Sequence, residues 1–286
     1  MEQKRYSGTF GAFPNLFDFL VMIFWVFIAQ IATVFLCSLC GLEIPDMTLI
    51  ESADDQVSLW TQLSMAQSLA IIYPIAMTLS IAGVLIYRKL RGGISKIASF
   101  SRAGFEPSRL LGLFVLMVAI QIVIEPLTEL MPDSPQVIGR GFFTVLISAI
   151  FAPIFEEFLC RGIILESFRA KHGIWAGLIF SSLFFGIIHG NITAAFGASI
   201  LGLILGYAYI RSNSIFAVII LHALNNGLAL ALMTFGLGDS SFRDAIPTPQ
   251  LYWTVWAVAF LITAIGSTII IRNLTLASRK EKSTKK

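Results

Sequence analysis

The amino-acid sequence predicts an all-α integral membrane protein. Of the 286 residues, 56% are hydrophobic and only 13% are charged, whereas soluble domains carry about 25% charged residues. Several apolar runs also reach the roughly 20 residues that a helix needs to cross the hydrocarbon core of a bilayer. The strict alternation of apolar and polar residues expected of a lipid-facing barrel strand is absent. These three observations favour a helical bundle embedded in a membrane.

About eight runs are apolar enough to form transmembrane helices. The first is too long for a secretory signal peptide and lacks a small-residue cleavage site, so we expect it to be retained as a helix. No internal repeat and no linker between soluble domains is visible, which favours a single polytopic domain over residues 1–286. In chain order the predicted spans are 16–40, 66–87, 110–131, 142–166, 173–190, 192–210, 214–237 and 251–271.

The positive charges alternate between the two ends of these spans. Lys and Arg residues gather before the first span, after the second, between the fourth and fifth, between the sixth and seventh, and in the tail, whereas the other loops hold almost none. Cytoplasmic loops of membrane proteins carry this excess, so we predict that both termini are cytoplasmic. The basic tail is interpreted as a topology anchor near anionic lipid. No folded module with interleaved aromatic residues accompanies it, so no nucleic-acid partner is expected.

The fourth span carries the charged residues with the largest free-energy cost of insertion into a membrane. Glu156, Glu157 and Arg161 lie within six residues of each other, and each charged side chain costs about 2.5–3.5 kcal/mol at the centre of a membrane helix. Glu157 and Arg161 are four residues apart and share a helix face, so an ion pair is predicted between them. Glu156 points about 100° away from Glu157. The ion pair has a structural explanation, whereas Glu156 is left as a candidate for chemistry.

The fifth span brings a histidine to a similar depth. Counting from the hairpin midpoint between the two spans gives about 15 residues back to Glu156 and about 17 forward to His189, a difference of less than one turn. Phe185 lies four residues before His189, so its ring can pack beneath the imidazole. Gly186 and Gly190 form a small-xxx-small pair that lets a neighbouring helix approach closely.

The seventh span adds His222 and Asn226, which are four residues apart and share a face. The sixth span carries a ridge of small residues suited to tight helix packing, namely Ala195, Ala198 or Ser199, Gly202 and Gly206. We therefore predict a polar site formed by helices 4, 5 and 7 in the cytoplasmic half of the membrane. A lone histidine in a membrane helix is often merely hydrogen-bonded, but the four polar groups together indicate a functional site.

These segments resemble the CAAX prenyl endopeptidase and bacteriocin-processing (CPBP, or Abi) family of intramembrane proteases. The family pattern E-E-x-x-x-R, F-x-x-x-H and H-x-x-x-N reads here as Glu156-Glu157-x-x-x-Arg161, Phe185-x-x-x-His189 and His222-x-x-x-Asn226, in the same order. The resemblance covers about residues 140–232, which we take as the catalytic core of spans 4–7. Cys160 stands where an aromatic residue is common in the family, a departure not expected to affect the chemistry.

The resemblance implies hydrolysis of a peptide bond in a membrane-associated peptide or protein, of which a prenylated or hydrophobic one is an example. Its implied roles are Glu156 as general base on a water, His189 as the holder of that water, and His222 with Asn226 as stabilisers of the oxyanion. Glu157, Arg161 and Phe185 would orient the site.

The need for a metal is left open by the sequence. Glu156, His189 and His222 supply the carboxylate and two imidazoles that suit a catalytic zinc. However, no H-E-x-x-H string is present, and Glu157 would be the only carboxylate left to act as base if Glu156 were a ligand. A metal-free, glutamate-activated mechanism is slightly preferred over a metalloprotease.

Two other classes of function compete with the protease. A bacteriocin-immunity or peptide-binding membrane protein could keep the fold without catalysis. A proton-coupled transporter could use the intramembrane Glu and His residues as relays, but no second copy of the motif-bearing half is visible. The short, loop-poor chain favours a bacterial cytoplasmic membrane as its location. The sequence does not identify the substrate or the oligomeric state.

Overall fold

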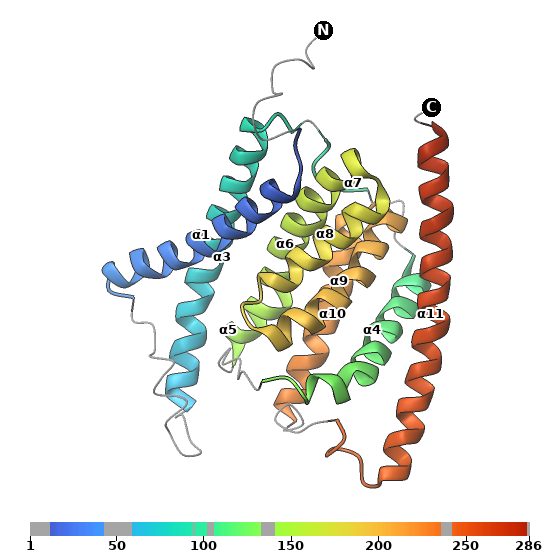
Figure 1. The fold of residues 1–286 in the computed structure, drawn as a ribbon. Coiled ribbons are helices and arrows are strands. Elements are labelled where there is room, and N and C mark those ends of the chain that lie inside the picture. Colours follow the sequence, from blue (N-terminus) through green and yellow to red (C-terminus); the bar gives the residue numbers. More distant parts are fainter. Residues whose placement is uncertain are drawn as a thin grey trace. The chain divides into compact units, whose positions relative to one another are not determined.

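The described part of the chain is mainly helical. The structure, a computed structural model, describes residues 12–42, 59–93, 95–101, 106–132, 141–235 and 242–284, and no β-strand occurs among them. In chain order the helices are α1 (Leu16–Leu39), α3 (Leu59–Leu90), α4 (Pro107–Thr128), α5 (Phe142–Val145), η1 (Leu146–Phe151), α6 (Ala152–Glu157), η2 (Phe158–Leu165), α7 (Glu166–His172), α8 (Ile174–Ile187), α9 (Ile192–Ser212), α10 (Ile215–Thr234) and α11 (Pro249–Thr284) (Figure 1).

The predicted fold class is confirmed. Seven helical stretches of the described residues are long and apolar enough to cross a membrane, and the chain is an all-α, multi-pass membrane protein. Each of the eight predicted spans is helical, but α8, the fifth, has only 14 residues. At 1.5 Å per residue it is about 21 Å long, which is shorter than the hydrocarbon core of about 30 Å. The cytoplasmic location of the termini stays a prediction.

The chain divides into two compact units, which are described separately. The first comprises the described residues within Met1–Ile94 and Ser134–Glu156, and the second those within Ser95–Asp133 and Glu157–Lys286. The boundary falls inside α6, between Glu156 and Glu157. The prediction of a single domain over residues 1–286 stays a prediction.

In the first unit, α1 packs against α3 and a buried carboxylate fastens the start of α1. Asn15 and Asp18 form a capping box that satisfies backbone N–H groups at the helix start. The Asp18 carboxylate also accepts hydrogen bonds from the Tyr87 hydroxyl and from Arg91 Nε, both at 2.7 Å. Asp18 thus has a structural role, which agrees with its position near a span end.

In the second unit, α8 packs closely on α9 through small residues. A Cβ atom added to Gly186 would lie 2.0 Å from Ser199 Oγ and 2.4 Å from the Ala195 carbonyl oxygen, so only glycine fits there. The predicted small-residue ridge is therefore the contact surface of α9. Gly190 has another role: nothing lies within 4 Å of its added Cβ, and its φ of +82° shapes the turn after α8.

The fourth span is not a uniform α-helix. Residues 142–172 form one continuous helical run in which η1 and η2 are π-helical and α6 lies between them. The prediction of a helix over 142–166 is correct, but the two π-helical segments were not expected from the sequence. Segments of this kind are rare and occur frequently at functional sites.

The last helix is longer than its predicted span of 251–271. It runs to Thr284, because the polar and basic residues after Arg272 continue the helix beyond the apolar stretch. From Trp253 to Arg272 the helix rises about 28 Å, close to the thickness of the hydrocarbon core. Arg169, at the end of α7, forms an ion pair with Glu281 of α11, about 12 Å beyond Asn273 along the helix. The α7–α8 hairpin therefore lies at the level of the polar part of α11.

Candidate active site

The predicted ion pair between Glu157 and Arg161 is confirmed. The Arg161 Nη1 atom donates to Glu157 Oε1 at 2.8 Å, and both side chains are fully buried. Arg161 Nη2 donates to the carbonyl oxygen of Gly202 at 3.0 Å, which ties the fourth span to α9. Glu157 and Arg161 thus connect two helices inside the second unit.

Glu157 also holds His222. The same oxygen, Glu157 Oε1, lies 2.8 Å from His222 Nδ1, although the two residues are 65 positions apart in the chain. A carboxylate paired with arginine can only accept a hydrogen bond, so Nδ1 of His222 carries the proton. In the neutral imidazole Nε2 is then an acceptor, and in the imidazolium it becomes a donor. Glu157 therefore fixes both the orientation and the tautomer of His222.

His189 is fixed in the same way by a backbone group. Its Nδ1 lies 2.6 Å from the carbonyl oxygen of Phe185, and a carbonyl oxygen can only accept. The proton of a neutral His189 is thus on Nδ1, which leaves Nε2 with its lone pair available. His189 lies in the turn after α8 and is half-buried. In both histidines Nδ1 is the nitrogen held by these contacts.

Phe185 lies at the centre of this group. Its ring is 2% exposed and meets the imidazoles of His189 and His222 edge-on, with centroids 4.9 and 5.4 Å apart. The guanidinium of Arg161 lies over the same ring, 4.5 Å from its centroid. The prediction that Phe185 packs against His189 is confirmed, and the ring also contacts two more residues of the motif set. We call the five residues in mutual contact here the motif cluster: Glu157, Arg161, Phe185, His189 and His222.

Replacing the ring of Phe185 tests its positioning role. In Phe185→Leu the backbone carbonyl still accepts from His189, but the two imidazoles and the guanidinium lose their shared packing surface. We expect the rate of the peptide cleavage that the family resemblance implies to fall by about 10–100-fold, because displacing reacting groups by up to about 1 Å has an effect of this size. The control is Phe184→Leu, which alters the neighbouring buried ring. Unchanged turnover in Phe185→Leu, or an equal loss in Phe184→Leu, would contradict the role.

Asn226 belongs to a chain of amide side chains. The Asn225 Nδ2 atom lies 3.4 Å from Asn226 Oδ1, and Asn225 Oδ1 accepts from Gln121 Nε2 of α4 at 3.0 Å. Because its Oδ1 accepts, Asn226 keeps its Nδ2 atom as a donor. Gln121 is a polar residue in an otherwise apolar span, and the sequence analysis did not predict its contact with Asn225.

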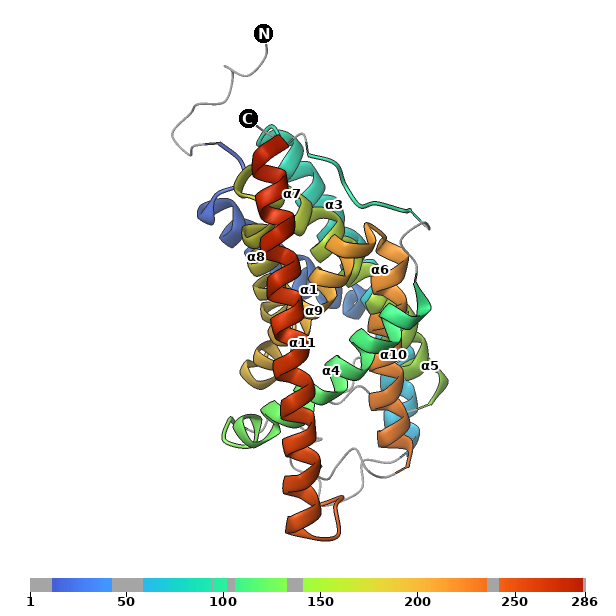
Figure 2. The same cartoon turned by 90° about the vertical axis from the view of Figure 1, so that its right-hand side faces the viewer.

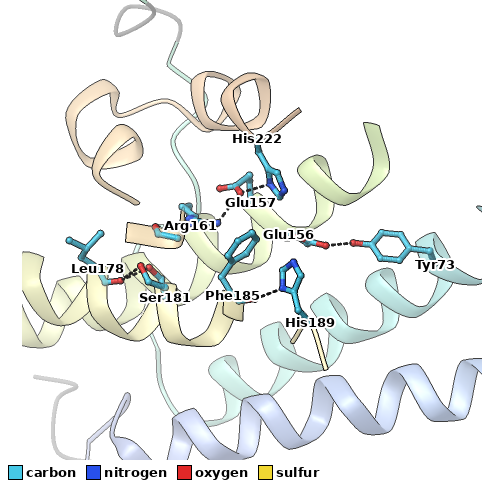
Figure 3. A network of polar contacts seen from close by, with 11 residues as sticks. Tyr73, Glu156, Glu157, Arg161, Leu178, Ser181, Phe185, His189 and His222 are labelled. Atoms are coloured by element: carbon cyan, nitrogen blue, oxygen red, sulfur yellow. Dashed lines mark hydrogen bonds and ion pairs between the residues drawn. The ribbon is translucent and has the colours of Figure 1, made fainter. Parts of the chain in front are cut away.

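Glu156 is described within the first unit. Its side chain is 9% exposed, and its Oε1 atom accepts a hydrogen bond of 2.7 Å from the hydroxyl of Tyr73 in α3 (Figure 3). Sequence reasoning missed Tyr73, although a phenol in an apolar span next to Pro74 is a signal that could have drawn attention. Glu156 precedes Glu157 by one peptide bond, so it is a chain neighbour of the motif cluster.

The structure thus brings five of the predicted site residues into direct contact within one unit. Asn226 is near these residues in the chain, because it lies one helical turn after His222 in α10. Glu156 is adjacent to Glu157 in the chain. Their proposed catalytic roles stay predictions. Among the described residues, no group of three or more His, Cys, Asp or Glu side chains is placed to hold a metal ion.

Comparisons with known proteins agree with this site. Residues 139–228 match the sequence profile of the family described as "Type II CAAX prenyl endopeptidase Rce1-like". A protein of Escherichia coli named "Uncharacterized 24.3 kDa protein" is 35% identical over 119 residues, which are 39% of this chain and 53% of the relative. The chain thus spans about half the length of that relative. No solved structure matches the chain.

The family match covers every residue of the motif cluster together with Glu156 and Asn226. Residues 139–228 are therefore similar to the Rce1-like family of CAAX prenyl endopeptidases, and the resemblance found in the sequence is confirmed.

Proposed function

We propose that this protein is an intramembrane endopeptidase that hydrolyses a peptide bond of a membrane-associated peptide or protein. The observation that carries the proposal is the fully buried Glu157 carboxylate, which binds Arg161 and His222 together. Burying a charge is costly unless it is paired, and here the pairing orients an imidazole. A bacterial cytoplasmic membrane is the proposed location, which the Escherichia coli relative supports.

In the proposed reaction Glu156 removes a proton from a water molecule, which attacks the carbonyl carbon of the scissile bond. The carbonyl oxygen becomes an oxyanion, and one hydrogen-bond donor to it is typically worth about 10²–10³ in rate. His222 in its imidazolium form donates from Nε2, and Glu157 at its Nδ1 stabilises that charge; Asn226 supplies a second donor. When the C–N bond breaks, Glu156 returns the proton that it took from the water to the nitrogen of the leaving amine, so a carboxylate and an amine are formed.

His189 completes the proposed set. Its Nε2 lone pair accepts a hydrogen bond from the water, and its Nδ1 bond to the Phe185 carbonyl keeps the ring in that orientation. In the metalloprotease version, His189, His222 and Glu156 would be the ligands of a divalent metal such as zinc, although no group of three such side chains is placed to hold one among the described residues. The metal-free version is preferred because Glu156 then serves as the base and not as a ligand.

Tyr73 is expected to position the proposed base. In Tyr73→Phe the hydrogen bond to Glu156 Oε1 is lost, and hydrogen bonds to charged groups are worth about 1.5–3 kcal/mol. We therefore expect cleavage to slow by about 10–100-fold. Tyr87→Phe is the matched control, because Tyr87 is on the same helix and donates to Asp18 at the same distance. Equal slowing of cleavage by the two changes would show that Tyr73 contributes to the stability of the fold and not to positioning the base.

The test of the function is cleavage by the detergent-purified full chain. A panel of fluorogenic peptides is offered, each prepared with and without a prenyl or acyl group, in the presence or absence of a chelator. We expect wild-type protein to cleave members of the panel, and His222→Ala to lose at least about 10²-fold in rate. Loss with the chelator and recovery with zinc would establish the metalloprotease version.

A folded wild-type protein that binds these peptides without cleaving any of them would overturn the proposal. That result would favour the bacteriocin-immunity or peptide-binding alternative instead. Binding is measured on the same panel by fluorescence anisotropy, so the two outcomes are distinguished in one experiment.

A further inference from the structure

An apolar cavity of about 510 Å³ lies in the second unit between α4, α9 and α11. Figure 2 shows these three helices, with α11 running along the outside. Apolar side chains such as Leu116 and Ile262 form most of the lining, and Arg109 and Arg211 also belong to it. No residue of the motif cluster lines this cavity, so it is a separate feature of the protein.

The cavity has a polar end and an apolar end. Arg109 lies near the start of α4, Arg211 near the end of α9, and Asn273 in the last third of α11. Asn273 Nδ2 donates to the Tyr207 hydroxyl at 2.8 Å, so both are fixed at this end. From Asn273 to Ile262, at the other end of the lining, α11 covers about 16 Å. The cavity is thus an elongated apolar groove with two guanidinium groups at one end.

The polar end lies at the level of the lipid headgroups. The aromatic residues Tyr252, Trp253 and Trp256 cluster at the start of α11, and such residues mark a membrane interface. Asn273 is about 30 Å further along the helix, at the opposite interface. Arg109 and Arg211 lie at the helix ends that the charge pattern assigns to the cytoplasmic side, where anionic lipids are found.

The two arginines provide positive charge that the cavity itself does not balance. No carboxylate is part of the lining, as far as the chain is described. Arg109 forms an ion pair of 2.9 Å with Glu106, in which Arg109 is half-exposed and Glu106 is exposed, and the other N–H groups of Arg109 are donors as well. Arg211 is exposed at the end of α9. Guanidinium groups at an interface bind phosphate oxygens well.

We propose that this groove binds one anionic glycerophospholipid, with the phosphate held by Arg109 and Arg211 and an acyl chain lying along Leu116 and Ile262. Shape and charge agree: the groove is as long as a large part of an acyl chain, and its positive end is at headgroup depth. The proposal is based on the groove, the aromatic cluster of α11 and the charge pattern, and it is independent of the proposed function.

Gly112 offers a way to close the groove without a clash. It lines the cavity, and nothing lies within 4 Å of a Cβ atom added to it. Gly112→Leu should therefore fill the acyl path while the helices keep their places. Gly197→Leu is the matched control, because Gly197 also has open space at its Cβ but does not line the cavity.

The test is lipid binding to the delipidated full chain, followed by native mass spectrometry in detergent. Phosphatidylglycerol and phosphatidylcholine are titrated separately. We expect wild type to bind one phosphatidylglycerol roughly tenfold to thirtyfold more tightly than phosphatidylcholine, as two interfacial arginines allow. The double variant Arg109→Gln/Arg211→Gln should lose that preference, and Gly112→Leu should weaken the binding of both lipids.

Arg272→Gln is the control for the loss of a positive charge. Arg272 is exposed on α11 and precedes Asn273, but it does not line the cavity. Equal affinity of wild type for the two lipids would overturn the proposal, as would an equal loss of preference in Arg272→Gln. It would also fail if Gly112→Leu bound both lipids normally, or if that change dissociated a dimer of the chain, since a second copy would then occupy the groove. The arginine variants change exposed or half-exposed side chains, so they keep the test decisive should Gly112→Leu not fold.

Discussion

Glu156→Gln should abolish peptide cleavage, with a rate loss of about 10³-fold or more if Glu156 is the general base. The amide keeps the size of the side chain, and its oxygen can still accept the hydrogen bond that Tyr73 donates to Glu156 Oε1. The variant should therefore fold and bind substrate as wild type does. What it loses is the ability to take a proton from water.

The measurement is turnover of the best peptide of the panel, with substrate affinity determined on the same preparation. Glu125→Gln serves as the matched control, because Glu125 is also a carboxylate within a predicted span and accepts from the Tyr252 hydroxyl. Turnover in Glu156→Gln within tenfold of wild type would remove Glu156 from the role of base. A parallel loss in Glu125→Gln would point to a general effect on the fold.

Arg161→Met should destabilise the second unit by about 3–5 kcal/mol, the cost of leaving one partner of a buried ion pair unpaired. The substitution removes the bond from Nη1 to Glu157, the bond from Nη2 to the Gly202 carbonyl, and the cation–π contact with Phe185. The Glu157 carboxylate then remains fully buried, with His222 as its remaining hydrogen-bond partner among the described residues.

The free energy of unfolding in detergent measures this effect. Adding Glu157→Gln to Arg161→Met removes the uncompensated charge, so the double variant should regain much of the lost stability. Arg272→Met, at an exposed position of α11, should change stability by no more than about 0.5 kcal/mol. A loss below about 1 kcal/mol in Arg161→Met would contradict a role for the pair in holding the helices together.

Local spacing explains which parts of the site could be predicted. Glu157 and Arg161, like Phe185 and His189, are four residues apart on one helical stretch, so their contacts follow from helix geometry. The close approach at Gly186 was predicted for the same reason, since a small residue in a membrane helix favours a tight crossing. Each of these predictions needed only one segment of the chain.

Contacts between distant segments could not be predicted. His222 is 65 residues from Glu157 and Tyr73 is 83 residues from Glu156, so no periodicity relates them. The sequence assigned Glu157 to Arg161 but did not show that the same oxygen also holds an imidazole. The length of α11 was underestimated because hydropathy marks where the lipid ends and not where the backbone hydrogen bonding ends.

The π-helical segments on either side of α6 bear on how the length of this span can vary among related chains. A π-helical turn contains one residue more than an α-helical turn, so η1 and η2 can each lose a residue and close into regular α-helix. Such a deletion rotates the C-terminal remainder of the helix by about 100° but leaves the backbone hydrogen bonding intact. We therefore expect that, when related chains are aligned, gaps of one residue fall in η1 and η2. The six residues of α6, which include Glu156 and Glu157, form a regular α-helix without an extra residue, so we expect no such gap there.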